Sequence, residues 1–429
     1  MRIRMAYHRE GMDVEIPEQN LVGVLECRDV EPDADGATLV AHAMTQPIGT
    51  QQLVDLARAK RSAVIAVCDV TRPVPNAVIL PQILRTIEAA GIARTAITIL
   101  VATGLHRPNG PAEWNEMFGT EVALRYRIEN HVATDAASHL ELGVTPRGVP
   151  VWIDRRWCEA DLKIAVGLIE PHFMAGWSGG RKLICPGLAS QETICRWHSP
   201  QFLENPAATI DSTLGNPVHE ENTWIARRAG CDFIVNVVID RDRRIQRVVA
   251  GDLELAWEQG VAFARERMTA TVPEPVDIVV TSAAGYPLDA TYYQAIKGIV
   301  CAAQIVKPGG TIICVAGMRE GLGSKPFVQC FDENPDPDVF MRNILADPTN
   351  ARIDQWQIEE FMKAIRKANC YFVTEGQPHE VLRRMYAMTA ESVELAIAAA
   401  IEKYGQNATI AVVPEGPYVL TKVAKNNEF

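Results

Sequence analysis

Charged and titratable side chains follow three short apolar runs of the sequence. In chain order they are Asp69 and Arg72, then His106, then His172. Each run has the character of a buried β-strand, and the carboxyl ends of parallel strands meet at one sheet edge, where ligands of α/β proteins bind. A histidine gives or takes a proton near neutral pH, and an arginine matches a carboxylate. A lone histidine there is more often a capping residue, but three such segments predict a functional site.

A glycine-rich segment from Gly176 to Lys182 is a second candidate. Glycines adopt positive φ angles and allow close backbone approach, so the N–H groups around Gly179 and Gly180 could cradle an anion. Lys182 could then pair with a phosphate or act as a nucleophile. The segment is not a Walker A motif, because Arg181 stands where the second glycine is required and no Ser or Thr follows the lysine. A helix-capping loop with a solvated lysine stays an open alternative.

Two further segments carry groups that suit a metal or a carboxylate. His198 stands near a predicted helix end, and with His106 and His172 it could form a metal site, since imidazole suits nickel, copper, zinc and iron. No H-x-x-x-H or H-E-x-x-H pair is present, so the fold or a cofactor would have to bring the donors together. Gln294 and Lys297 share a helix face and could bind a carboxylate. The alternatives are a packing role for His198 and solvated positions for Gln294 and Lys297.

The elements that must position these residues alternate between strand and helix. Short apolar runs, each followed by polar or glycine-rich sequence, predict βα units on a mostly parallel sheet. Such strands are expected at Ser62–Cys68, Ala96–Ala102, Leu162–Val166 and Phe233–Ile239. After a long helix over Asp252–Met268, the proline-bearing stretch 271–275 resembles a linker. We therefore predict an α/β protein of two domains, 1–270 and 276–429, each a mostly parallel sheet flanked by helices, the second Rossmann-like.

The composition narrows the function classes. The chain has 429 residues, of which 48% are hydrophobic and 22% charged, as in ordinary globular proteins. The formal charge of −11 repels phosphate backbones, so no nucleic-acid partner is expected. None of the ten cysteines forms a C-x-x-C pair, so a zinc ribbon is not expected. Without a signal peptide or an apolar run of about 18 residues, we expect a cytoplasmic protein with no membrane span.

Taken together, the segments resemble the nickel-dependent lactate racemase family. The resemblance lies in Asp69-x-Thr-Arg-Pro, Thr103-Gly-x-His-Arg, Glu170-Pro-His, Gly176-Trp-Ser-Gly-Gly-Arg-Lys, His198, and Gly285-Tyr-Pro-Leu-Asp leading to Tyr293-Gln-x-x-Lys297. No single motif is specific, but the combination and its order are. The resemblance implies a racemase or epimerase of a small-molecule 2-hydroxy acid, lactate or a larger relative, with its active site in the cleft between the domains.

The resemblance also implies a cofactor, the nickel pincer nucleotide, a pyridinium mononucleotide whose sulfur and carbon atoms hold nickel. Lys182 would tether this cofactor through its ε-amine, and His198 would be the protein ligand of nickel. Asp69 would lie against the cofactor, and backbone donors at Gly179 and Gly180 would meet its phosphate. Because the cofactor is made by other enzymes, the sequence does not tell whether purified protein carries it.

In the same way, the resemblance makes His106 and His172 the two acid/base groups. One histidine removes the hydroxyl proton while hydride passes to the cofactor, and a planar 2-keto acid forms. Hydride then returns to either face, and the histidine on the other side reprotonates the oxygen. The substrate-binding residues would be Arg72 and Lys297 for the carboxylate, with Gln294 assisting, and Tyr293 and Trp356 from the second domain.

Differences from the family pattern concern the substrate. Thr291-Tyr292 stand where Asn-Leu usually precedes the Tyr-Gln pair, Glu359-Glu360 add charge after the tryptophan, and Phe173-Met174 are bulky. A larger 2-hydroxy acid, or C2 epimerisation of a sugar acid, therefore fits as well as lactate.

Two other classes of protein stay open. One is a catalytically inactive anion-binding protein on the same fold, against which the intact set of histidines and lysine argues. The other is a nickel-free hydrolase that uses His106 or His172. Gly176–Gly180 has the G-x-S-x-G spacing of a nucleophile elbow, but it does not directly follow a predicted strand, as an elbow must.

Overall fold

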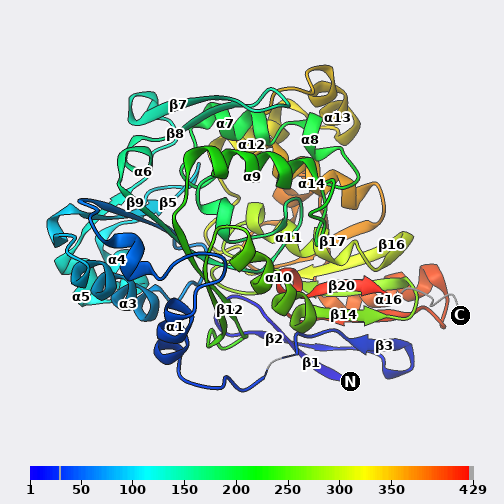
Figure 1. Cartoon of the computed structure of the whole chain (residues 1–429). Coiled ribbons are helices and arrows are strands. Elements are labelled where there is room, and N and C mark those ends of the chain that lie inside the picture. Colours follow the sequence, from blue (N-terminus) through cyan, green and yellow to red (C-terminus); the bar gives the residue numbers. More distant parts are fainter. Residues whose placement is uncertain (29, 425–429) are drawn as a thin grey trace, which may run out of the picture.

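The computed structural model describes residues 1–28 and 30–424, which form two lobes (Figure 1). The first lobe is built on a six-stranded sheet of order β13-β12-β9-β4-β5-β6, and the second on a six-stranded sheet of order β18-β17-β16-β15-β19-β3. Helices flank both sheets, so the predicted α/β class with two mostly parallel sheets is confirmed. None of the helices in the described ranges has the length and apolar character of a membrane span.

The central strands of the first sheet are apolar and buried on both faces, whereas the edge strand β6 is polar and less buried. The members of this sheet are β4 (Ala63–Cys68), β5 (Ile97–Ala102), β6 (Arg127–Asn130), β9 (Leu162–Leu168), β12 (Phe233–Ile239) and β13 (Ile245–Gly251). All neighbours are parallel except β12 and β13, which are antiparallel. Strand order reverses between β4 and β9, and such a switch point leaves a crevice at the carboxyl ends of the strands.

Helices cover both faces of this sheet because alternate strand residues point in opposite directions. Ile65 and Val67 of β4 belong to one apolar cluster, and Val64 and Ala66 belong to another. The first cluster includes helices α1 (Gly36–Thr45), α2 (Leu53–Ala57), α3 (Asn76–Ala89), α4 (Pro111–Phe118) and α5 (Thr120–Arg125). The second includes α6 (Arg155–Glu159), α7 (Gln191–Trp197), α8 (Pro200–Leu203), α9 (Pro217–Ala229) and α10 (Leu255–Met268). A small antiparallel pair, β7 (His139–Val144) and β8 (Pro150–Asp154), lies beside α6 and α7.

The second sheet is parallel throughout. Its strands are β15 (Val276–Ser282), β16 (Val306–Val315), β17 (Asn369–Val373), β18 (Met388–Thr389), β19 (Ile410–Val413) and β3 (Leu21–Val24). Helix α16 (Val393–Tyr404) and the hairpin β1 (Arg2–Met5)–β2 (Met12–Glu15) share the apolar cluster on one face. On the other face lie α11 (Tyr292–Ala302), α12 (Lys325–Glu333), α13 (Pro337–Ala346), α14 (Gln355–Ile365) and α15 (His379–Arg384).

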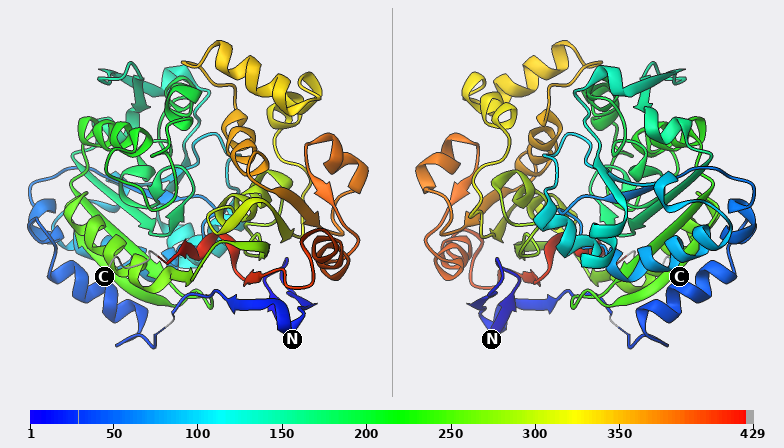
Figure 2. Two further views of the ribbon diagram at one scale, coloured as in Figure 1. Left: turned by 90° about the vertical axis from the view of Figure 1, so that its right-hand side faces the viewer. Right: turned by 90° about the vertical axis from the view of Figure 1, so that its left-hand side faces the viewer.

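The structure corrects the predicted domain limits at two places. Residues 1–24, assigned by the sequence to the first domain, belong to the second lobe, since β3 pairs with β19 (Figure 2). The predicted linker is partly a strand: β14 (Thr269–Val272) pairs in parallel with β20 (Leu420–Val423). The chain therefore crosses between the lobes both near residue 25 and near residue 272. Residues 425–429, the end of the predicted second domain, lie outside the described residues.

Candidate active site

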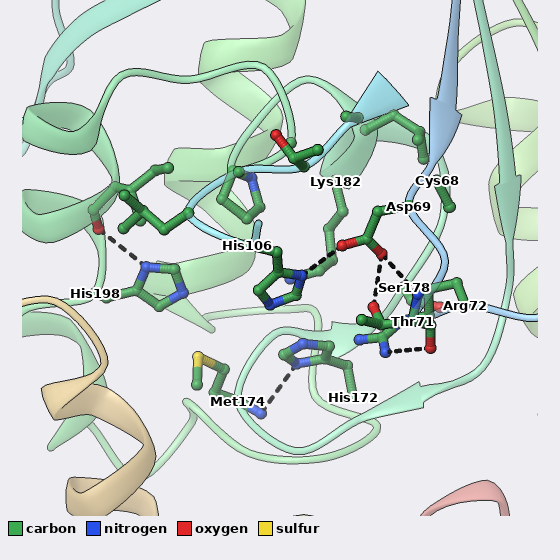
Figure 3. Close-up of a pocket in the computed structure, with 18 of the residues that line it drawn as sticks. Cys68, Asp69, Thr71, Arg72, His106, His172, Met174, Ser178, Lys182 and His198 are labelled. Carbon is green, nitrogen blue, oxygen red and sulfur yellow. Dashed lines mark hydrogen bonds and ion pairs between the residues drawn. The ribbon is translucent and has the colours of Figure 1, made fainter. Parts of the chain in front are cut away.

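A pocket lies at the switch point between β4 and β9, and α11 and α14 of the second lobe close it. Ten of the predicted site residues line it: Asp69, Arg72, His106, His172, Gly179, Lys182, His198, Tyr293, Lys297 and Trp356. Figure 3 shows the rings of His106, His172 and His198 gathered around one space. The structure therefore brings these predicted residues together in one pocket between the lobes, at the strand ends.

His106 is oriented by the carboxylate that follows β4. Its Nδ1 lies 2.6 Å from Oδ2 of Asp69, and Asp69 also accepts hydrogen bonds from the hydroxyl and the N–H of Thr71. Burial would raise the pKa of Asp69, but His106 and Thr71 outweigh burial and lower it. An ionised Asp69 keeps the proton of His106 on Nδ1, which leaves Nε2 of His106 as a base.

His172 is held in a different way, by backbone donors. It stands in the short strand β10 (Pro171–His172), which pairs with β11 (Gly176–Trp177) and so closes the segment into a tight hairpin. The N–H groups of Met174 and Ala175 donate to its Nδ1 at 3.4 and 3.3 Å. This network assigns the proton of the neutral ring to Nε2. Burial, followed by the charge of Lys182, lowers the pKa of His172 well below its ordinary value.

The glycine-rich segment places Lys182 in the pocket but uses Gly179 and Gly180 differently. Gly179 lines the pocket with a φ of +77°, and a Cβ there would lie 2.7 Å from Oδ1 of Asn236, so only glycine fits. Gly180 does not line the pocket, and its N–H donates to Asn236 Oδ1 at 2.6 Å. The predicted anion contact of Gly180 is therefore not supported, because its donor is already used by a residue of β12.

Lys182 is a half-buried amine that lines the pocket in a basic neighbourhood. Burial, with the charges of Arg181 and Arg72, lowers the pKa of Lys182 to about 7. The neighbouring Arg181 points away from the pocket, where its guanidinium stacks on Trp257 and donates to the carbonyls of Ala175 and Trp177. A substantial fraction of the Lys182 amine is thus neutral and nucleophilic near pH 7.

His198 fits the role of a single metal ligand. It caps α7, and its Nδ1–H donates to the carbonyl of Ile194 at 2.9 Å, which leaves the lone pair on Nε2. Burial, with the charge of Lys182, lowers its pKa to about 3, so the ring is neutral. Trp356 stacks on it with ring centroids 4.4 Å apart. Within the described ranges, no group of three or more His, Cys, Asp or Glu side chains is arranged to hold a metal ion.

Two more of the predicted residues, Arg72 and Lys297, supply positive charge. Arg72 lines the pocket and pairs with Glu170, with 3.1 Å between Nε and Oε1. Lys297 is 9% exposed and donates to Oε1 of Gln294, which is itself buried and lies outside the pocket lining. Burial and the charge of Arg72 lower the pKa of Lys297. Gln294 therefore positions Lys297, and neither is the solvated surface residue of the alternative interpretation.

Asp354, Gln357 and Ser178 are among the pocket residues that the sequence analysis did not single out as site residues. Asp354 and Gln357 reach the pocket from the start of α14, and their only sequence signal is their spacing around Trp356. Ser178 also lines the pocket, at the serine position of the G-x-S-x-G spacing. Its hydroxyl donates to the carbonyl of Leu168 and accepts from the N–H of Glu170, so it is fixed as a structural bridge. That role argues against the hydrolase alternative.

Comparison with known proteins covers nearly the whole chain. The lactate racemase N-terminal domain matches residues 7–211, and the lactate racemase C-terminal domain matches residues 272–421. The lactate racemase of Lactiplantibacillus plantarum is 35% identical over 424 residues, which are 98% of this chain and 99% of that protein. The lactate racemase of Thermoanaerobacterium thermosaccharolyticum is 33% identical over 423 residues, with 98% and 99% covered.

Solved structures agree with the sequence comparison. The apoprotein of the Thermoanaerobacterium thermosaccharolyticum lactate racemase superposes with a TM-score of 0.92, covering 98% of this chain and 100% of that chain at 33% identity. A Thermotoga maritima protein, 16% identical with a TM-score of 0.71, shares the fold alone. Both domains, their order and their full lengths match, so this chain is a racemase and belongs to the lactate racemase family.

Proposed function

We propose that the enzyme racemises or epimerises a 2-hydroxy acid, lactate or a larger relative, with a nickel pincer nucleotide as cofactor. The observation that carries the proposal is one pocket holding two differently protonated histidines, His106 and His172, beside the cations Arg72 and Lys297. A 2-hydroxy acid offers each of these groups a partner. Its carboxylate suits the cations, and its hydroxyl suits the two imidazoles.

The cations fix the carboxylate end of the substrate. Arg72 and Lys297 reach the pocket from opposite lobes, and both line it. Glu170 holds Arg72 in place through its guanidinium Nε. A bound carboxylate restores the charged form of Lys297, whose pKa burial and Arg72 depress. Binding would therefore draw the two lobes together on the substrate and exclude water from it.

The histidines handle the hydroxyl proton. His106 presents a basic Nε2 because Asp69 engages its Nδ1. His172 presents an Nε2–H because backbone N–H groups engage its Nδ1. One ring is therefore set to accept the hydroxyl proton, and the other to donate to the oxygen. A racemase needs such a pair, because the two enantiomers present their hydroxyl groups to opposite sides.

The residues around Lys182 and His198 suit the cofactor. The lone pair on Nε2 of His198 fits nickel, and the partly neutral amine of Lys182 fits covalent attachment. Gly179 allows close approach of a phosphate to the backbone. When bound, the cofactor supplies a hydride acceptor, so that C2 of the substrate becomes planar as a 2-keto acid. This chain itself contributes the free Nε2 of His198 and the amine of Lys182, whose pKa is lowered.

The first experiment measures nickel per chain in protein produced together with the enzymes that make the pincer cofactor. The wild type is expected to hold close to one nickel per chain, and His198→Ala is expected to lose most of it. Chiral chromatography of 2-hydroxy acids incubated with the loaded wild type then tests the reaction itself.

A family member of known activity, produced alongside, controls for cofactor supply. If the control enzyme held nickel and the wild type did not, the proposed cofactor role would be wrong. If the wild type held nickel but racemised none of the 2-hydroxy acids, the proposed substrate class would be wrong. If His198→Ala retained its nickel, a residue other than His198 would be the metal ligand.

A further inference from the structure

One buried amide in the pocket has no hydrogen-bond partner in the part of the chain that the structure describes. Gln357 lines the pocket beside Trp356, and only 1% of its surface is exposed. Its Nε2 meets no acceptor among the described residues. A buried N–H donor without an acceptor destabilises a protein, so such groups in native structures call for a partner. A ligand oxygen in the pocket would be that partner.

The local sequence explains why this amide is available. Asp354-Gln-Trp-Gln357 has the spacing of a capping box, in which an N-cap side chain bonds the N3 backbone and the N3 side chain reaches back. Helix α14 forms neither contact. Asp354 is the N-cap residue, but its φ is +65° and its side chain caps no N–H group of the helix. Its carboxylate instead accepts a hydrogen bond from the hydroxyl of Ser324.

Both capping-box side chains therefore lie along the pocket wall. Asp354 is 8% exposed and lines the same pocket as Gln357. A non-glycine residue in the left-handed region carries backbone strain, which tends to occur at functional sites. The pair offers one acceptor, the carboxylate, and one donor, the amide, on the same end of α14.

The other groups of a 2-hydroxy acid already have partners elsewhere. The carboxylate suits Arg72 and Lys297, and the 2-hydroxyl suits His106 and His172. The end of α14 is then left to face the substituent that C2 carries. A methyl group gives Gln357 no acceptor. A second carboxylate gives it an acceptor but offers Asp354 no donor. A hydroxyl group donates to a carboxylate and accepts from an amide, so it satisfies both.

We propose that Gln357 and Asp354 select a substrate with a hydroxyl group on C3, so that a 2,3-dihydroxy acid is preferred over lactate. The inference rests on the proposed function and names its substrate class. Sites that hydrogen-bond a substrate hydroxyl discriminate strongly against the analogue that lacks it, because their polar groups are then left unpaired.

The test compares lactate with glycerate, which differs from lactate by one oxygen on C3, on the cofactor-loaded enzyme. Racemisation of each single enantiomer is followed by chiral chromatography. We expect kcat/KM for glycerate to exceed that for lactate at least ten-fold in the wild type. Gln357→Leu and Gln357→Met, two apolar variants of similar size, are expected to bring the ratio within about three-fold of one.

Gln355→Leu is the matched control. Gln355 lies two residues before Gln357, is 4% exposed and also has a partnerless Nε2 among the described residues, but it does not line the pocket. This control should keep the wild-type ratio. A preference for lactate in the wild type, or an unchanged ratio in both Gln357 variants, would overturn the inference and leave the proposed function standing. Loaded wild type that racemises neither acid nor any other 2-hydroxy acid would overturn both.

Discussion

The wall of the pocket that comes from the first lobe holds its reactive rings firmly. Asp69 fixes His106, the N–H groups of residues 174 and 175 fix His172, and the carbonyl of Ile194 fixes His198. Each ring uses Nδ1 for its support, so Nε2 remains for the ligand. The chemistry of the enzyme is thus oriented before any ligand binds.

The wall from the second lobe is different. On α14, Gln357 of this wall and Glu359, which does not line the pocket, are buried with side-chain atoms that meet no partner within residues 1–28 and 30–424. Asp354, at the start of this helix, has a strained backbone. Polar groups that the protein itself leaves unsatisfied are costly, and they persist where a ligand or a functional transition supplies the partner.

The difference separates two tasks. The first-lobe wall positions groups that every 2-hydroxy acid needs, and the second-lobe wall meets the part of the substrate that varies. Changes to the first wall should therefore reduce turnover of all substrates alike. Changes to the second wall should alter which substrate is used, or the stability of the closed protein.

The largest effect is expected on the first wall. His106→Ala and His172→Ala should each lower kcat by about 10²–10⁴-fold in the loaded enzyme, since a positioned acid or base contributes that much. Because the two enantiomers of the substrate have equal free energy, kcat/KM must fall equally in both directions. Chiral chromatography from each pure enantiomer measures this. His42→Ala, at an exposed histidine of α1, is the control. If either variant kept full activity and the wild-type nickel content, the proposal that the first-lobe wall carries the chemistry would be wrong.

The strand ends of the first lobe were predictable because their signal is local. The apolar runs that became β4, β5 and β9 are short and strongly patterned, and polar residues follow each of them. The rule that ligands bind at the carboxyl edge then brings Asp69, His106 and His172 together without any structure.

Non-local pairing was not predictable in the same way. The contact of β3 with β19 joins residues almost 390 positions apart, and no periodicity in either strand reveals its partner. The hydrogen bond from the Gly180 N–H to Asn236 also joins residues far apart in the sequence, here by 56 positions. At α14, Asp354-Gln-Trp-Gln357 has the spacing of a capping box, yet the φ of Asp354 is +65° and its side chain caps no N–H group of the helix.

A smaller effect concerns the reactivity of Lys182. Because its pKa is lowered to about 7, mainly by burial and then by Arg181, it should react with a small amine-directed reagent at pH 7 about ten-fold or more faster than exposed Lys403. Competitive labelling of cofactor-free protein with peptide mass spectrometry measures this. The rate should follow a titration near pH 7. In Arg181→Met the midpoint should move upward, since a positive charge is removed. An unlabelled Lys182 at pH 9 would contradict the assignment of an accessible nucleophile.

The smallest effect on turnover is expected at Glu359, one helical turn beyond Trp356. Burial, followed by the charges of Glu204 and Glu360, raises the pKa of Glu359 to about 9. Its folded-state pKa lies above the unfolded value of about 4.5, so the folded protein must retain a proton that the unfolded chain releases. The stability of the wild type relative to Glu359→Gln is therefore highest below about pH 4.5 and falls as pH rises toward 9, by roughly 1.4 kcal/mol per pH unit at most.

Glu359→Gln removes this dependence and keeps the shape of the side chain. The difference in free energy of unfolding between Glu359→Gln and wild type should grow by a few kcal/mol from pH 5 to pH 8 in urea titrations. Glu402→Gln, on the exposed face of α16, should show no such growth. Helix α14 also contacts the first lobe, since Nζ of Lys363 donates to the carbonyl of Leu203 in α8 at 2.6 Å. If the pH slope of Glu359→Gln equals that of wild type, Glu359 has a partner in solution, and the contrast between the two walls rests on Gln357 alone.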